Sequence, residues 1–151
     1  MKTLKRIAVA LLCLLNLACT LPLVAQDKED YPIFVFNNGV EDEQFDTPEK
    51  QVKLLKDNGY DGMEKKGIDG FEETLEALEK NGLKLFTMYI NINLDDEEQP
   101  YDKRLKEVFQ KLEGSETMPW FYITSKKYKP SSQENDAVAV PILREIADMA
   151  N

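Results

Sequence analysis

The sequence predicts an α/β protein built from four βα units whose strands are parallel. Short runs of β-branched and aromatic residues alternate four times with longer segments whose apolar residues recur at helical spacing. The strand starts, near Pro32, Tyr60, Gly82 and Met118, are spaced as βα units are. Such alternation implies a parallel sheet with right-handed crossovers and helices packed outside it.

Residues 1–25 are expected to be a signal peptide. Three basic residues open the chain, the apolar stretch Ile7–Ala18 is too short to span a bilayer, and small residues precede a cut after Ala25. The protein is therefore expected to be exported, to the periplasm or the medium, with residues 26–31 as a linker. A lipoprotein cut before Cys19 is the second interpretation, and an uncleaved membrane anchor is the third.

Charge limits the partners of the mature chain. Cleavage after Ala25 would leave 126 of the 151 residues, enough for one domain with a core. Three of the 19 basic residues lie in the signal, so 16 remain against 28 acidic residues, a balance near −12. This balance disfavours nucleic acid and, after signal cleavage, membrane surfaces as partners.

The mature chain would contain neither Cys nor His. Both cysteines, Cys13 and Cys19, lie in the signal, and the sequence has no His. This composition excludes disulfides, Cys or His zinc sites, Cys nucleophiles and Ser-His-Asp triads from the mature protein. Catalysis would depend on carboxylates, Lys, Tyr or backbone dipoles.

The first βα unit combines a strand over 32–38 with a helix over 46–59. The strand run "PIFVFNN" is β-branched and aromatic. Thr47 can cap the helix, Pro48 suits its first position, and Gly59 can end it in the left-handed conformation.

The second unit and the third strand follow. Residues 60–67 are a weaker strand candidate. A helix over 69–82 is expected to be capped by Asp69 and ended by Gly82. The run "LKLFTMYINI" over 83–92 is the strongest strand in the chain.

The remaining elements are a helix over 101–114, a strand over 118–124 and a final helix. The final helix is expected to begin near Asp136, or near Pro141 if that proline lies in its first turn, and to run to Asn151.

Alternation in the third and fourth strands separates two faces. Apolar side chains expected against the helices are Phe86, Met88, Ile90, Ile92, Phe121 and Ile123. The opposite set grows more polar toward the carboxyl ends: Thr87, Tyr89, Asn91, Trp120, Tyr122 and Thr124. Barrel sites have this pattern, and so do the crevices of open sheets, so both architectures stay open at this point.

Several stretches resemble the xylose isomerase-like TIM barrels, also called sugar phosphate isomerases/epimerases. They are the strand ending in Asn38-Gly39, the junction "LLKDNGYDG", the strand "GLKLFTMYI" and the unit that starts at "WFYIT". The likeness covers Tyr31 to Asn151, and it depends on the order and spacing of the four stretches together.

The resemblance implies that residues 32–151 are the N-terminal half of a (β/α)8 TIM barrel. Such enzymes move a proton next to a carbonyl of a sugar or sugar phosphate. Their divalent metal is held by Glu, Asp, His and Glu on strands five to eight, which this sequence lacks. The expectation is an isomerase/epimerase-like protein truncated before its metal site, with no cofactor in this chain and a divalent metal in a full-length relative. Alternatives are a noncatalytic remnant, a glycan-binding module, a keto-sugar hydratase or lyase, and a self-contained open α/β domain.

The candidate site residues follow the predicted strands. Glu64 is a weak candidate for a catalytic base, against a solvated charged turn. Candidates for carbohydrate contacts are Asn37, Asn38, Tyr89, Asn91, Thr124 and Lys126, with Lys127 beside the last. For the two lysines an ordinary exposed loop is the favoured interpretation, and for Asn37 and Asn38 a turn is an equal alternative.

Two further expectations concern loops and edges. The acidic stretch 93–100 lacks calcium-loop spacing, so a solvated loop is expected and no metal site is assigned. Half a barrel would leave two strand edges unpaired, and the chain is therefore expected to self-associate through them.

Overall fold

A computed structural model describes residues 31–36 and 42–150 of the chain. The sheet and helices described below belong to the unit Pro32–Asn151. The expected signal peptide and the candidates Asn37 and Asn38 lie outside the described residues.

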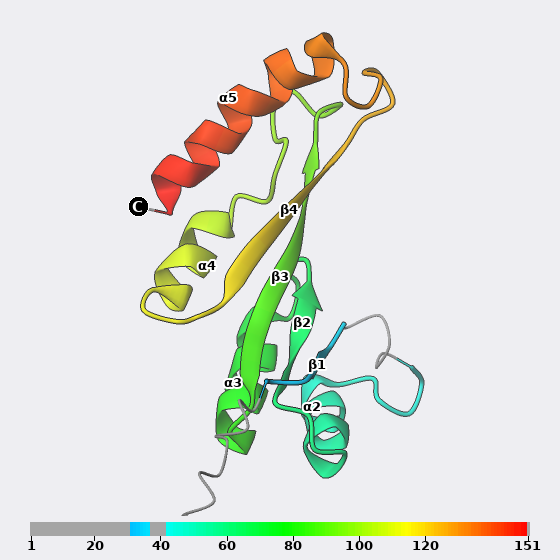
Figure 1. Cartoon of the computed structure of the whole chain (residues 1–151), viewed down its shortest axis with the longest axis vertical. Coiled ribbons are helices and arrows are strands. Elements are labelled where there is room, and N and C mark those ends of the chain that lie inside the picture. The colour runs from blue at the N-terminus through cyan, green and yellow to red at the C-terminus, as the bar shows by residue number, and fades with distance from the viewer. Residues whose placement is uncertain (1–30, 37–41, 151) are drawn as a thin grey trace, which may run out of the picture. The chain divides into compact units, whose positions relative to one another are not determined.

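Four parallel strands form one sheet in the order β1-β2-β3-β4, which is also their order along the chain (Figure 1). The strands are β1 (Phe34–Val35), β2 (Gly62–Lys66), β3 (Lys84–Asn93) and β4 (Met118–Thr124). The helices that alternate with them are α2 (Pro48–Asp57), α3 (Phe71–Asn81), α4 (Leu105–Leu112) and α5 (Gln133–Met149). The predicted α/β fold of four βα units is confirmed.

The hydrophobic core joins one face of the sheet to the helices. Alternate strand residues Met63, Met88, Ile90 and Ile92 are buried in the same cluster as residues of all four helices. The helical members include Val52, Leu55, Phe71, Leu78, Leu105, Val108, Leu112, Ala139 and Ile146. Strands in sequential order with right-handed crossovers place every helix on the same side of a sheet, which matches this core.

The other face of the sheet, called the open face below, carries the side chains that alternate with the core set. Its members are Phe34, Phe36, Gly62, Glu64, Lys66, Phe86, Thr87, Tyr89, Asn91, Met118, Trp120, Tyr122 and Thr124. Its apolar members Phe36, Met118 and Trp120 are more than half exposed. This exposure is unusual, because parallel sheets usually have both faces buried.

Helix ends follow the predicted caps in α2 and at the end of α3. The Thr47 hydroxyl accepts a hydrogen bond from the backbone N–H of Lys50 at 3.4 Å, and Pro48 begins α2. Gly59 and Gly82 have φ of 77° and 68°, the left-handed conformation expected where helices stop.

Three predicted helix starts are wrong. Helix α4 begins at Leu105 and not at residue 101. Gly70, not Asp69, occupies the N-cap of α3, and the Asp69 carboxylate instead pairs with the Arg104 guanidinium at 2.7 Å. Helix α5 begins at Gln133, because the Ser132 side chain caps it by accepting a hydrogen bond from Asn135 N–H at 3.2 Å. Pro141 consequently lies inside α5 rather than in its first turn.

A β-bulge explains one wrong face assignment. The register between β2 and β3 shifts between Met63 and Glu64, so Phe86 is an extra residue in β3. The alternation predicts Phe86 on the helix face, but the bulge places it on the other face. Its ring instead stacks on that of Phe34, with 4.8 Å between centroids.

Candidate functional site

The strand register brings the predicted site residues of β2 and β3 together with neighbours from β4. Lys66, Tyr89 and Trp120 lie side by side across three strands, and so do Glu64, Thr87 and Met118. Because side chains alternate along a strand, both rows point to the open face. Tyr89 and Glu64, two of the predicted candidates, are therefore near neighbours.

Aromatic rings cover much of this face. The Tyr89 ring stacks on the Tyr122 ring, with centroids 4.4 Å apart and planes inclined by 19°. It also meets Trp120 edge-on, with centroids 5.6 Å apart at 75°. Both arrangements are preferred geometries for aromatic pairs. The contacts hold the Trp120 ring in place although 55% of the residue is exposed.

A pocket of about 340 Å³ lies on the open face, lined by Phe36, Glu64, Lys66, Tyr89 and Trp120. Three of its walls are aromatic and two carry opposite charges. Glu64 is only 3% exposed, whereas Lys66 is exposed and Phe36 is 53% exposed. An apolar pocket with a few convergent polar groups is the usual form of a small-molecule site, and this volume is at the small end of that range.

A buried hydroxyl lies next to the pocket in the same row as Glu64. Among the described residues, the Thr87 hydroxyl is the only buried side-chain polar atom without a hydrogen-bond partner. Leaving a buried polar group unpaired costs about 1–3 kcal/mol. Thr87 itself does not line the pocket.

The candidates Asn91 and Thr124 lie further toward the carboxyl ends of their strands. The Thr124 hydroxyl donates to the Asn91 side-chain oxygen at 3.0 Å. The structure thus brings these two predicted contacts together, but it joins them to each other, and neither lines the pocket.

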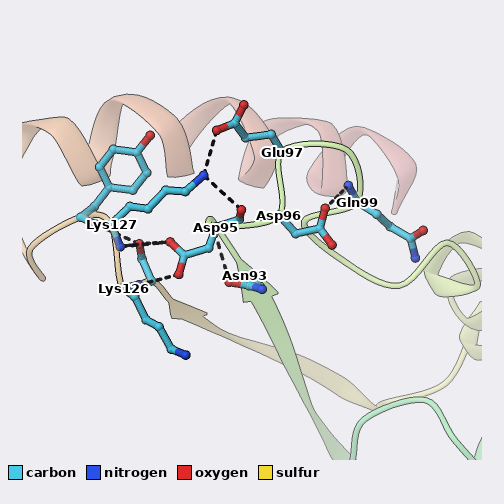
Figure 2. Close-up of polar contacts among 9 residues, drawn as sticks. Asn93, Asp95, Asp96, Glu97, Gln99, Lys126 and Lys127 are labelled. Atoms are coloured by element: carbon cyan, nitrogen blue, oxygen red, sulfur yellow. Dashed lines mark hydrogen bonds and ion pairs between the residues drawn. The ribbon is translucent and has the colours of Figure 1, made fainter.

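The candidate Lys126 belongs to a hydrogen-bonded loop after β4 (Figure 2). The Asp95 carboxylate accepts hydrogen bonds from the Ser125 hydroxyl at 2.6 Å and from the backbone N–H groups of Lys126 and Lys127 at 2.7 and 3.1 Å. These bonds, that from Ser125 above all, hold the pKa of Asp95 below its usual value. The loop between β3 and α4 is thereby fixed to the loop between β4 and α5.

The two lysines of this loop differ in direction. The Lys127 ammonium pairs with the Glu97 carboxylate at 2.9 Å, while the exposed Lys126 side chain points away from this cluster (Figure 2). Lys127 is thus engaged within the protein. Neither lysine lines the pocket on the open face.

Three pocket residues were not among the predicted site residues: Phe36, Lys66 and Trp120. Alternation in the sequence already placed Trp120 on the same face as Tyr122 and Thr124. The missing signal was its exposure, which depends on what packs over the face.

Within 31–36 and 42–150, no group of three or more His, Cys, Asp or Glu side chains is arranged to hold a metal ion.

Over the same part of the chain, no helix is long and apolar enough to cross a membrane.

A scan against protein-family models finds no match to this sequence, and a comparison with curated proteins finds none either. The chemistry of the open face, rather than that of a relative, therefore carries the functional proposal.

Proposed function

We propose that this protein binds a carbohydrate in the pocket on its open face. The observation that carries the proposal is the combination of aromatic walls from Phe36, Tyr89 and Trp120 with the charged groups of Glu64 and Lys66. A sugar ring has C–H groups on its faces and hydroxyls on its rim. Aromatic rings have a negative π-face that attracts polarised C–H groups, and carboxylate and ammonium groups bond to hydroxyls.

The other properties of the chain support a neutral polar ligand. The formal net charge of −9 opposes binding of polyanions. Glu64 and Lys66 contribute opposite charges to the pocket, so the pocket does not select strongly for either sign. The resemblance of the sequence to sugar isomerases and epimerases favours the same class of ligand.

A fluorescence titration tests the proposal directly, because Trp120 is the only tryptophan in the chain. A panel of neutral and acidic monosaccharides and short oligosaccharides is added to the full chain, and the emission of Trp120 is recorded. A sugar that stacks on the indole is expected to shift this emission in a saturable way. The affinity is then measured independently by calorimetry.

Substitution assigns the binding to the pocket. Trp120→Ala is expected to weaken binding about 2- to 10-fold, the range that aromatic pairs contribute. Tyr101→Phe alters an aromatic residue outside the pocket and is expected to leave the affinity unchanged. A panel without any binding sugar, or equal affinities for Trp120→Ala and wild type, would contradict the proposal.

Proton transfer is the second candidate function, and the position of Glu64 favours it. This carboxylate lines the pocket and is almost completely buried. A base there can remove a proton from the carbon next to the carbonyl of an aldose and return it to the former carbonyl carbon. The hydroxyl proton passes to the carbonyl oxygen in the enediol between these steps, and the aldose becomes a ketose. Deuterium from solvent would then enter the bound sugar at that carbon, and Glu64→Gln would stop this exchange while binding persists.

A further inference from the structure

We propose that the open face is also a docking surface for a second copy of this chain, which forms a two-fold dimer. This inference goes beyond sugar binding and does not require it, because the association is expected without ligand. It depends on the exposure, size and charge of the open face.

The exposed apolar side chains are concentrated on one part of the open face. Met118 is 67% exposed and Trp120, two residues later on the same strand face, is 55% exposed. Phe36 is 53% exposed and lines the same pocket as Trp120. The residues are thus neighbours, unlike the singly scattered apolar residues found on most surfaces.

The area is sufficient for a dimer. Large side chains of this kind bury roughly 150–250 Å² each, so the exposed halves of three supply roughly 300 Å² per copy. A two-fold axis doubles this area, and the half-buried neighbours Phe34, Phe86 and Tyr122 extend it. The total buried area is then on the order of 1,000 Å², the size at which specific interfaces begin.

The charge of the open face favours contact between two copies through this face over contact through their other surfaces. The formal net charge is −9, so most encounters between two copies bring negative surfaces together. On the open face, Glu64 and Lys66 contribute opposite charges to the same pocket. Lys84, at the start of β3, is paired with Glu116 at 2.8 Å. Two copies can therefore meet at this face without net repulsion.

The sheet itself provides the physical reason for covering this face. Strands β1 and β4 are the two edges of the described sheet, and the helices lie on one side only. A parallel sheet normally has both faces covered. A second copy that places its open face against the first buries both faces at once, and its symmetry closes the assembly at two chains.

Sedimentation of the full chain over a range of concentrations tests the inference. The wild type is expected to pass reversibly from its 17.3 kDa monomer to twice that mass. Met118→Glu and Trp120→Glu place a charge in the interface of each copy and are expected to raise the dimer Kd about 10-fold or more. Val140→Glu adds the same charge at an exposed apolar residue of α5 and is expected to leave the Kd unchanged.

Circular dichroism establishes whether each variant is folded. If a variant is not folded, a footprinting measurement on the wild type still tests the inference. Oxidative footprinting is expected to show Met118 and Trp120 becoming protected as the protein concentration rises, while Val140 does not. A wild type that stays monomeric overturns the inference. So does association that Met118→Glu, Trp120→Glu and Val140→Glu affect equally, since it would use another part of the chain.

Discussion

Tyr101 shows how one side chain connects two elements and makes the stability depend on pH. Its hydroxyl donates to the Glu145 carboxylate at 2.6 Å and so joins the loop after β3 to α5. This hydrogen bond, together with burial and the negative charge of Glu145, raises the pKa of Tyr101 to about 12. The protonated tyrosine is therefore more favourable in the folded chain than in the unfolded one, where its pKa is near 10.

The direction of the pH effect follows from this difference. The stabilisation by Tyr101 is fully present below pH 10 and is lost as the pH rises from about 10 to about 12. Denaturant unfolding over this window is expected to show a larger loss of unfolding free energy in the wild type than in Tyr101→Phe, which cannot ionise. Below this window the two proteins are expected to have parallel profiles of unfolding free energy against pH. Profiles that stay parallel through the window as well would refute the role of Tyr101.

The sequence predicted those site residues whose environment is determined by strand alternation. Tyr89 and Glu64 line the pocket because strand periodicity alone places them on its face. Thr124 and Asn91 lie on that face as well, but their mutual hydrogen bond depends on the register between β3 and β4, which no local pattern specifies. The exposure of Trp120 depends on the packing of all four described helices against the other face, which is a property of the whole sheet.

At the scale of elements, the long strands and the middles of the helices were predictable, whereas some helix starts and the extent of the first strand were not. Within the described part of the predicted strand 32–38, β1 covers only Phe34–Val35. The predicted strand 118–124 coincides with β4, because its alternation is long and regular. In α5 the expected penalty for an internal proline, about 3 kcal/mol, argued for a start at Pro141. The Ser132 cap and the burial of Ala139 and Ile146 offset that penalty, and burial is a tertiary effect.

Gly62 is the element-scale position at which a single methyl group is expected to matter most. A Cβ atom at this residue would collide with the Lys84 carbonyl oxygen and lie 2.8 Å from the Phe86 ring. Both neighbours belong to β3 at the bulge, and backbone atoms cannot rotate away. Gly62→Ala is therefore expected to lower the free energy of unfolding by about 3 kcal/mol, the upper end for overpacking.

Gly114→Ala is the matched control for this strand contact. Gly114 has φ of 77° and open space where its Cβ would lie, so the substitution adds only left-handed backbone strain of about 1 kcal/mol. Equilibrium denaturation measures both variants. Equal losses for the two would show that the approach of β2 to β3 does not limit stability.

For the whole molecule, the order of the strands explains both the confirmed fold and the unpredicted surface. Four βα units in a row predict adjacent parallel strands, and the sheet has that order. The same order places the described helices on one side, so the side chains that alternate with the core residues form the open face. Aromatic residues such as Trp120 and Phe36 then become available for a ligand or another chain, although by composition alone they would be assigned to a core.

Sugar and a second copy are expected to compete, because both proposals use Phe36 and Trp120. Two ligands that exclude each other weaken each other by the same factor. A sugar at 100 times its Kd is expected to raise the dimer Kd about 100-fold for each of the two sites it occupies. Sedimentation with and without sugar measures this change, and the emission of Trp120 measures the reverse effect as a loss of sugar affinity at high protein concentration. Trp120→Ala removes a shared contact and is expected to weaken both equilibria. A sugar that left the dimer unchanged, or tightened it, would separate the two surfaces and show that the pocket stays accessible when two copies meet.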